Sequence, residues 1–305
     1  MSDRLLIHIG YHKTATTWMQ YRLFNATNGY RKICTHAEVD ALVVRPYGLA
    51  FDPAPMQRRI AAALAEMPAA LVPVVSSEIL SGNPLQGGRE SDAFAARLQR
   101  IAPEARILVS IRAQMRILPS IYLQYLSRGG TMRAAQFFAG TEEPGYVGFD
   151  PAHFEYDRLI GLYRRLFGAD RVFVLPQESL LADADAILGR LARFCGNTVF
   201  SGLSDRARRP LIASYPEHAV PVLRRLNHLR RSTLNPAPVV NLDTRRQTLY
   251  RAAGYLSRTR PVMRLLGRRR RVSDHVARVF AGYFTASNAR LKAMLGDGTD
   301  LPGYD

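Results

Sequence analysis

Short apolar runs alternate with amphipathic stretches over the first 200 residues or so, which is the pattern of βαβ units around a parallel sheet. Four apolar runs read as strands: Leu5–Ile9, Leu71–Ser76, Arg106–Ile111 and Arg171–Leu175. Stretches of helical periodicity cover Thr16–Asn25, Pro55–Glu66, Ser91–Ile101, Gln114–Arg128, Pro151–Phe167 and Leu180–Phe194. The turn-forming composition of Gly140–Asp150 predicts a loop. We therefore expect a three-layer α/β fold with a central parallel sheet.

Beyond Gly196 the pattern becomes helical and basic, with helices expected at Glu217–Leu229 and Ser273–Leu295. Two prolines make Asn235–Asn241 irregular, and no internal repeat is found. We expect one domain over residues 1–305, in which residues 1–200 form the α/β core. Residues 201–305 then form a mostly helical, basic elaboration.

Composition supports a folded cytoplasmic protein. The chain is 47% hydrophobic and 22% charged, which argues against extensive disorder. The first apolar run is too short for a signal peptide, and no later run approaches the roughly 20 apolar residues of a membrane span. The two cysteines, Cys34 and Cys195, are too few for a disulfide framework and lack metal-ligand spacing. A reducing cytoplasm is the simplest location.

The charge is strongly positive, +17, and nearly all the cations are arginines. Such a charge attracts polyanions, whether nucleotides, nucleic acid, acidic glycans or an anionic membrane, without choosing among them. A GC-rich genome explains the arginine bias equally well. Lys13 is one of only three lysines, and its place in a glycine-threonine loop suggests that a compact point charge is needed there.

The loop Gly10–Thr17 follows the first predicted strand and opens a helix. A loop in this place presents backbone N–H groups and a positive helix end to an anion, and a lysine adds a mobile charge. It is not a Walker A motif, because His12 rather than glycine precedes Lys13. The loop therefore predicts phosphate binding of another kind.

A second candidate phosphate contact lies at the end of the strand Arg106–Ile111. Arg112 follows this strand, at the edge where α/β folds bind ligands, and a guanidinium fork suits a phosphate. Ser120, eight residues later on the next helix, adds a hydroxyl. On its own, a strand-end arginine is more often a surface ion-pair partner.

Together the two elements resemble the PAPS-dependent sulfotransferase family, in particular its bacterial carbohydrate-type members. The resemblance implies the P-loop-like sulfotransferase fold, with PAPS (3′-phosphoadenosine 5′-phosphosulfate) as co-substrate, PAP as product and no metal. Lys13 would contact the 5′-phosphate and the oxygen that bridges it to sulfur, while Arg112 and Ser120 would hold the 3′-phosphate. The nucleotide-binding residues would be Gly10, Tyr11, His12, Lys13, Thr14, Ala15, Thr16, Thr17, Arg112 and Ser120.

One position departs from the family pattern: Ala15 stands where the family usually has glycine. If the backbone needs a positive φ there, alanine costs on the order of 1 kcal/mol. Weaker similarity to the family continues around Glu178, at Ser287–Leu291 and at Asp300–Tyr304, where helix packing is an equally good explanation.

Sulfuryl transfer also needs a base that removes the proton of the acceptor. Glu78 ends the apolar strand Leu71–Ser76 on the side of the crevice, and Ser76-Ser77-Glu78 is similar to the pattern of several glycan sulfotransferases. A carboxylate in that position can act as a general base. Alternatively, Glu78 caps a turn or pairs with an arginine. His12 is then the next candidate, whereas His8 lies inside a strand and reads as a core residue.

The basic clusters of the C-terminal third remain open to two interpretations. Runs such as Gly267–Arg271 are either solvated helix faces or a track for an anionic acceptor, such as an acidic or lipid-linked glycan. A peripheral membrane contact fits the same charge. Two other functions are alternatives: an ATP-dependent P-loop kinase, which would need a Walker lysine and a Mg²⁺ carboxylate, and a nucleic-acid-binding protein. The second leaves the paired phosphate elements unexplained, so no specific nucleic acid is expected.

Overall fold

A computed structural model describes residues 3–140, 148–209, 215–238, 240–241, 248–296 and 299–304. The chain forms two compact units. Unit 1 comprises Met1–Ala113, Ala152–Leu211 and Phe284–Asp305, and unit 2 comprises Gln114–Pro151 and Ile212–Tyr283. That all of residues 1–305 form one domain stays a prediction. Most of the predicted loop Gly140–Asp150 lies outside the described residues.

Unit 1 is built on a parallel five-stranded sheet in the order β2-β3-β1-β4-β5. Its strands are β1 Leu6–His8, β2 Tyr30–Lys32, β3 Val72–Ser76, β4 Arg106–Ile111 and β5 Val172–Pro176. β1 lies in the centre, with His8 opposite Ser76 of β3 and Leu108 of β4. Apart from the edge strand β2, these strands are almost fully buried, which is why they appear in the sequence as continuous apolar runs.

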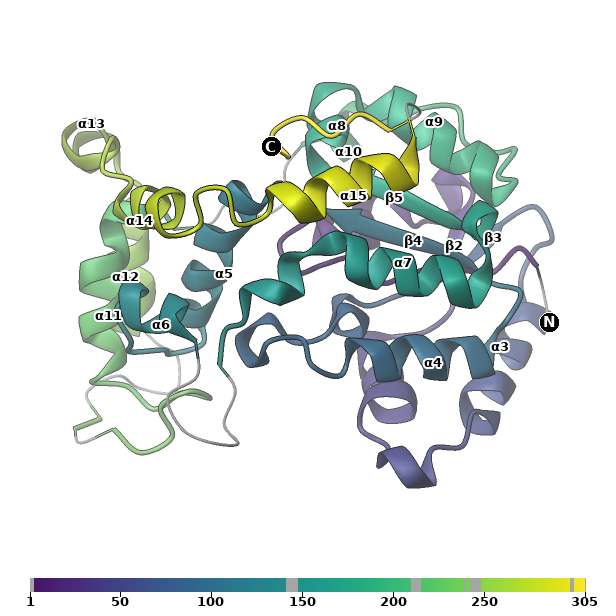
Figure 1. Cartoon of the computed structure of the whole chain (residues 1–305), viewed down its shortest axis with the longest axis horizontal. Coiled ribbons are helices and arrows are strands. Elements are labelled where there is room, and N and C mark those ends of the chain that lie inside the picture. Colours follow the sequence, from purple (N-terminus) through teal and green to yellow (C-terminus); the bar gives the residue numbers. More distant parts are fainter. Residues whose placement is uncertain are drawn as a thin grey trace. The chain divides into compact units, whose positions relative to one another are not determined.

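Helices cover both faces of this sheet. On one face α7 contacts β4 and β5, and α4 and α15 pack beside α7 (Figure 1). On the other face an apolar cluster joins Leu6, Val74 and Leu108 to Met19 and Leu188. The helices of unit 1 are α1 Thr16–Trp18, α2 His36–Val39, α3 Ala54–Ala65, α4 Ser91–Ile101, α7 Tyr156–Phe167, α8 Gln177–Ala182, α9 Ala184–Cys195, α10 Asp205–Arg208 and α15 Thr285–Leu295. The predicted three-layer α/β fold is confirmed.

Unit 2 is helical among its described residues. It contains α5 Gln114–Ser127, α6 Ala134–Ala139, α11 Val220–Asn227, α12 Thr248–Leu256, α13 Arg260–Leu266 and α14 Arg271–Val279. A cluster of aromatic rings, including Tyr122, Phe137 and Phe138, packs α5 against α6. The prediction of one helix over Ser273–Leu295 is wrong, because α14 ends at Val279 and α15 begins at Thr285. Gly282 lies between the two helices with a φ of 70°, a left-handed value outside the α-helical range.

Candidate functional site

The candidate site residues of unit 1 come from three neighbouring strands. Glu78 follows β3, the loop Gly10–Thr17 follows β1, and Arg112 follows β4. Because β3, β1 and β4 are adjacent and parallel, their carboxyl ends lie at the same edge of the sheet. This edge is where ligands of open α/β sheets bind.

The backbone of the loop after β1 is unusual at two positions. Lys13 has a φ of 66° and Ala15 a φ of 64°, and they are the two non-glycine residues with positive φ in the described part of the chain. Turns that alternate in this way point backbone N–H groups toward a common side, which favours an anion. The backbone at position 15 does need a positive φ. Ala15 therefore holds a left-handed conformation that glycine would adopt without strain.

Gly10 is required for a different reason, since its own φ is not positive. A Cβ atom at Gly10 would lie 1.9 Å from the hydroxyl oxygen of Ser110 and 2.5 Å from Nε2 of His8. Real atoms do not approach this closely. Glycine lets the loop leave β1 directly over two buried polar side chains.

Lys13 and Arg112 converge. The Arg112 guanidinium donates a hydrogen bond of 3.5 Å to the carbonyl of Lys13. Partial burial lowers the pKa of Lys13, and the positive charge of Arg112 nearby lowers it further. Two cations held this close repel each other, and an anion bound between them would remove that repulsion.

Aromatic side chains fix the backbone on which these cations stand. The hydroxyl of Tyr156 in α7 donates to the carbonyl of Arg112 at 2.6 Å. The buried ring of Tyr11 packs edge-on against Tyr156, with 4.7 Å between ring centres. After the loop, Trp18 donates its indole N–H to the carbonyl of Ala207 at 2.7 Å. Residues from distant parts of unit 1 thus hold the loop after β1 and the first residue after β4.

A buried chain of hydrogen bonds, here called the polar chain, runs beneath the loop. It links Ser76, His8, Ser110 and Thr14: His8 Nδ1 lies 2.8 Å from the Ser76 hydroxyl, His8 Nε2 lies 3.1 Å from the Ser110 hydroxyl, and Ser110 lies 2.7 Å from the Thr14 hydroxyl. The Thr14 hydroxyl donates to the carbonyl of Tyr11 at 2.5 Å.

The direction of these bonds can be worked out from that last contact. Thr14 uses its proton on Tyr11, so it accepts from Ser110, and Ser110 in turn accepts from Nε2–H of His8. Nδ1 of His8 then accepts from Ser76. Complete burial lowers the pKa of His8 to about 3, so the ring is neutral and one nitrogen donates while the other accepts.

Gln20 connects this chain to Glu78. Its side-chain amide donates to the Ser76 hydroxyl and to Oε2 of Glu78, both at 3.3 Å. Glu78 is half-buried and begins a 3-10 turn, Glu78–Ser81. A hydrogen bond from a neutral amide orients the carboxylate without neutralising it, so its second oxygen is left for another donor.

The other predicted residues have less defined surroundings. His12 and Thr16 are buried in unit 1, and Thr17 is half-buried. Ser120 lies in α5 and belongs to unit 2, where its hydroxyl donates to the carbonyl of Arg116 at 3.2 Å. Its pairing with Arg112 on one phosphate stays a prediction.

The weaker sequence matches toward the C-terminus have a structural explanation. Glu178 accepts a hydrogen bond of 3.2 Å from the backbone N–H of Ala113 and one of 3.3 Å from the hydroxyl of Tyr304. In the same unit, Asp157 of α7 pairs with Arg290 and accepts from Ser287, both in α15. These residues fasten the last segments of unit 1 to α7 and α8, and Glu178 also holds the residue that follows Arg112.

Sequence reasoning missed the role of Ser110, Ser76 and Gln20. A signal was present, because His8, Ser76 and Ser110 are polar residues near the ends of three otherwise apolar strands. These residues meet only because of the strand register, which the sequence does not reveal.

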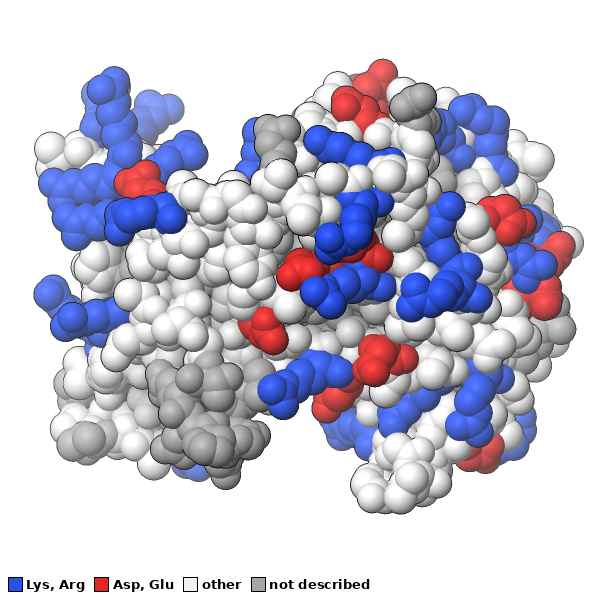
Figure 2. Space-filling model, in the orientation of Figure 1, with Lys and Arg blue, Asp and Glu red and all other residues white. Residues whose placement is uncertain are grey.

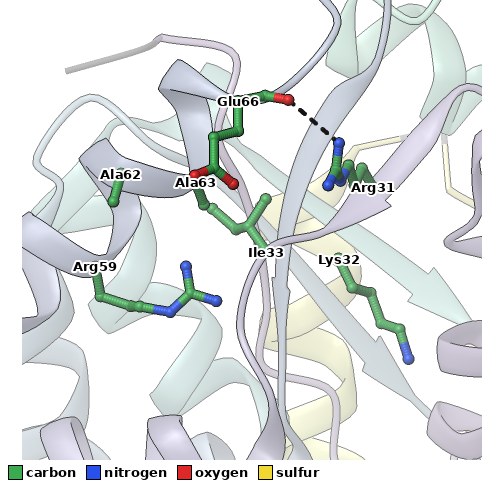
Figure 3. A pocket seen from close by; sticks show the side chains of 7 residues that line it. All are labelled: Arg31, Lys32, Ile33, Arg59, Ala62, Ala63 and Glu66. Carbon is green, nitrogen blue, oxygen red and sulfur yellow. Dashed lines mark hydrogen bonds between the residues drawn. The ribbon is translucent and has the colours of Figure 1, made fainter.

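A pocket of about 410 Å³ lies elsewhere in unit 1, between the edge strand β2 and α3 (Figure 3). Figure 3 shows Arg31 bonded to the carbonyl of Glu66. Arg59 forms an ion pair with Glu38, which neutralises its positive charge. None of the candidate site residues lines this pocket. Its lining residues are Arg31, Lys32, Ile33, Arg59, Ala62, Ala63 and Glu66.

Comparison with known proteins bears on the fold. No protein-family model and no curated protein matches the sequence. The structure is similar to the crystal structure of a sulfotransferase from Alicyclobacillus acidocaldarius, over 98% of this chain and 97% of that one, with a TM-score of 0.55. The fold is that of a sulfotransferase. At 14% sequence identity the sulfotransferase-like fold is what the comparison shows, and the roles of individual residues must be argued from their chemistry.

No group of three or more His, Cys, Asp or Glu side chains suited to a metal ion is found among the described residues. Within the same residues, none of the helices combines the length and the apolar character needed to cross a membrane.

Proposed function

We propose that this protein is a sulfotransferase that moves the sulfuryl group of PAPS to a hydroxyl or amine, with a carbohydrate or glycolipid as the acceptor. The observation that carries the proposal is the convergence of Lys13 and Arg112 over a loop with two left-handed residues. It is supported by the sulfotransferase fold and by the resemblance of the Gly10–Thr17 loop to the family's phosphosulfate loop.

In this proposal the loop after β1 binds the 5′-phosphosulfate. The Lys13 ammonium neutralises the charge that develops on the phosphate oxygen when the bond from that oxygen to sulfur breaks. The polar chain keeps the loop in shape, since Thr14 is tied to Ser110 and His8 on one side and to the Tyr11 carbonyl on the other. Arg112, with Ser120, binds the 3′-phosphate.

On the acceptor side, Glu78 removes the proton of the attacking hydroxyl or amine. Its position after β3, next to the strand that carries the loop, and the amide of Gln20 on one of its oxygens support this role. The acceptor oxygen or nitrogen forms the new bond to sulfur as the proton passes to Glu78, and PAP leaves. Cys34 and Cys195 are both buried free thiols, which agrees with a cytoplasmic location.

Calorimetry tests the donor site. We expect PAP to bind on the order of 10–100-fold more tightly than AMP, because charge-assisted hydrogen bonds to the 3′-phosphate contribute about 1.5–3 kcal/mol each. Arg112→Ala should narrow this gap, whereas Arg89→Ala, which removes an exposed charge of the same sign in unit 1, should not. Equal affinities for PAP and AMP would contradict the proposal, and tighter binding of ATP than of PAP would favour a kinase.

Turnover with PAPS tests the chemistry. Lys13→Ala should lower kcat by on the order of 10²–10³, as the loss of an oxyanion donor does, with a smaller effect on PAP affinity. Lys32→Ala, at an exposed lysine of β2, is the matched control. Glu78→Gln should lower kcat by roughly 10²–10⁴ with PAP affinity unchanged. If the Gln variant keeps its turnover, Glu78 is not the base and His12→Asn becomes the next test.

A further inference from the structure

The segment from Thr248 to Arg271, here called the arginine segment, is rich in positive charges that have no role in the proposed reaction. It contains eight arginines and no lysine, aspartate or glutamate. All eight arginines are exposed: Arg251, Arg258, Arg260, Arg264, Arg268, Arg269, Arg270 and Arg271. The segment forms α12, α13 and the start of α14 in unit 2. Figure 2 shows blue side chains gathered where Figure 1 labels α13 and α14, with one small red area among them.

One face of α12 is firmly attached to unit 2. Tyr250 is buried in a cluster with Leu223 of α11 and with Tyr215. The buried guanidinium of Arg230 stacks on the Tyr250 ring, 4.0 Å from its centre. A Cβ atom at Gly254 would lie 2.1 Å from the ring of Tyr215, so the helix approaches this ring as closely as its backbone allows. The orientation of α12 is therefore set by packing.

The outward side of the segment carries large apolar side chains among its arginines. Tyr255 is 74% exposed, Leu256 60% and Leu265 80%, and Leu249 and Met263 are exposed as well. α13 has no buried residue at all along its length. Only Val262 and Leu266 are partly covered, so α13 gains little from the core of its own unit, and a contact with another surface would stabilise it.

We propose that the arginine segment is an interfacial membrane contact that binds an anionic phospholipid surface. Leu256, Met263 and Leu265 would enter the boundary between headgroups and acyl chains, while the arginines contact lipid phosphates. Exposed leucines flanked by arginines on short helices fit this boundary, which is apolar on one side and anionic on the other. A nucleic acid would use the arginines alone, because its phosphate backbone offers leucine no apolar contact.

The contributions of the two kinds of side chain can be separated. Each arginine near an anionic surface strengthens binding by about fivefold, so four of them contribute on the order of several hundred-fold. Each leucine that leaves water contributes roughly another tenfold. Charge should govern the dependence on lipid composition and salt, while the leucines should contribute at every salt concentration.

The test is co-sedimentation of the full chain with vesicles of phosphatidylcholine alone or with about one-third phosphatidylserine. We expect binding to the anionic vesicles only. Replacing Arg268, Arg269, Arg270 and Arg271 together by glutamine should weaken it by several hundred-fold. The matched control replaces four exposed arginines of unit 1 by glutamine, namely Arg58, Arg89, Arg165 and Arg193. It lowers the net charge equally but should retain most of the binding, because these arginines lie outside the arginine segment.

A second pair of variants tests the apolar part. Leu256→Ser and Leu265→Ser change exposed side chains, so the fold should survive, and together they should weaken vesicle binding by about 100-fold without changing the charge. Equal vesicle binding by the wild type and the four-arginine variant would overturn the proposal. Leucine variants that bind vesicles like the wild type would overturn it as well. If double-stranded DNA then binds as tightly as the vesicles do, the segment is a general polyanion contact.

Discussion

Replacing Ala15 by glycine should not destabilise the protein, although alanine-to-glycine changes usually do. Ala15 precedes α1 with a φ of 64° and a ψ of 19°, a left-handed conformation that costs an L-residue about 1–2 kcal/mol. Glycine removes this cost. Glycine also has more conformational freedom than alanine in the unfolded chain, which destabilises the folded variant by about 0.4–1 kcal/mol.

The methyl group of Ala15 also packs against the apolar cluster of the sheet and is half-buried. Losing it costs about 0.4 kcal/mol, half the value of a fully buried methylene group. The three contributions leave Ala15→Gly between neutral and stabilising by about 1 kcal/mol. Ala61→Gly is the matched control, because Ala61 is exposed inside α3, where glycine should destabilise by about 1 kcal/mol.

Thermal melting followed by circular dichroism can resolve the contrast. A free-energy change of 1 kcal/mol shifts Tm by about 2 °C in a chain of this size. Ala61→Gly should lower Tm by that amount, and Ala15→Gly should leave it unchanged or raise it by up to about 2 °C. If Ala15→Gly lowers Tm as much as the control does, the left-handed backbone of the loop is not under strain.

Three further outcomes are expected. Gly10→Ala should lower Tm by several degrees and weaken PAP binding at least tenfold, because its Cβ would collide with Ser110 and His8; wild-type melting would contradict the close approach. Burial lowers the pKa of His8 to about 3 and that of His153 to about 4, so below the unfolded value of 6.5 the unfolded chain binds protons first. Stability should therefore decrease as the pH drops below 6.5, by about 1.4 kcal/mol per pH unit for each histidine. His153→Gln should flatten the dependence of Tm on pH, and an unchanged dependence would show that His153 titrates normally. Arg230→Met should speed amide hydrogen exchange in unit 2, where Arg230 donates to buried carbonyls, and uniform exchange across both units would contradict this assignment.

Much of the sheet could be predicted because burial leaves a direct trace in the sequence. β4 begins and ends where the sequence predicts, since all but one of its residues are fully buried and apolar or small. β2 was missed because it is a three-residue edge strand in which Arg31 and Lys32 are exposed. The helix predicted over Thr16–Asn25 continues past α1 as a π-helical turn, Met19–Leu23, a change of hydrogen bonding that no periodicity reveals.

For the candidate site, the sequence could predict which strand ends carry chemistry, and the parallel order of the sheet brings Lys13 and Arg112 together. It could not predict how those ends are connected underneath. The link from Glu78 through Gln20 to His8 depends on strand register and on side-chain direction. The sequence also gives no indication that Ser120 belongs to another compact unit than Arg112.

The central place of β1 in the sheet has a consequence for synthesis of the protein. β1 is the first of the five strands to leave the ribosome, yet its partners are β3 and β4, so one of its edges stays unpaired until Ser76 has emerged and the other until Ile111 has emerged. At roughly 5–20 residues per second, the hundred or so intervening residues take on the order of 5–20 s. During that time an apolar strand with an open edge can pair with a neighbouring chain. The yield of folded protein should therefore depend on translation speed and on chaperones that bind nascent chains.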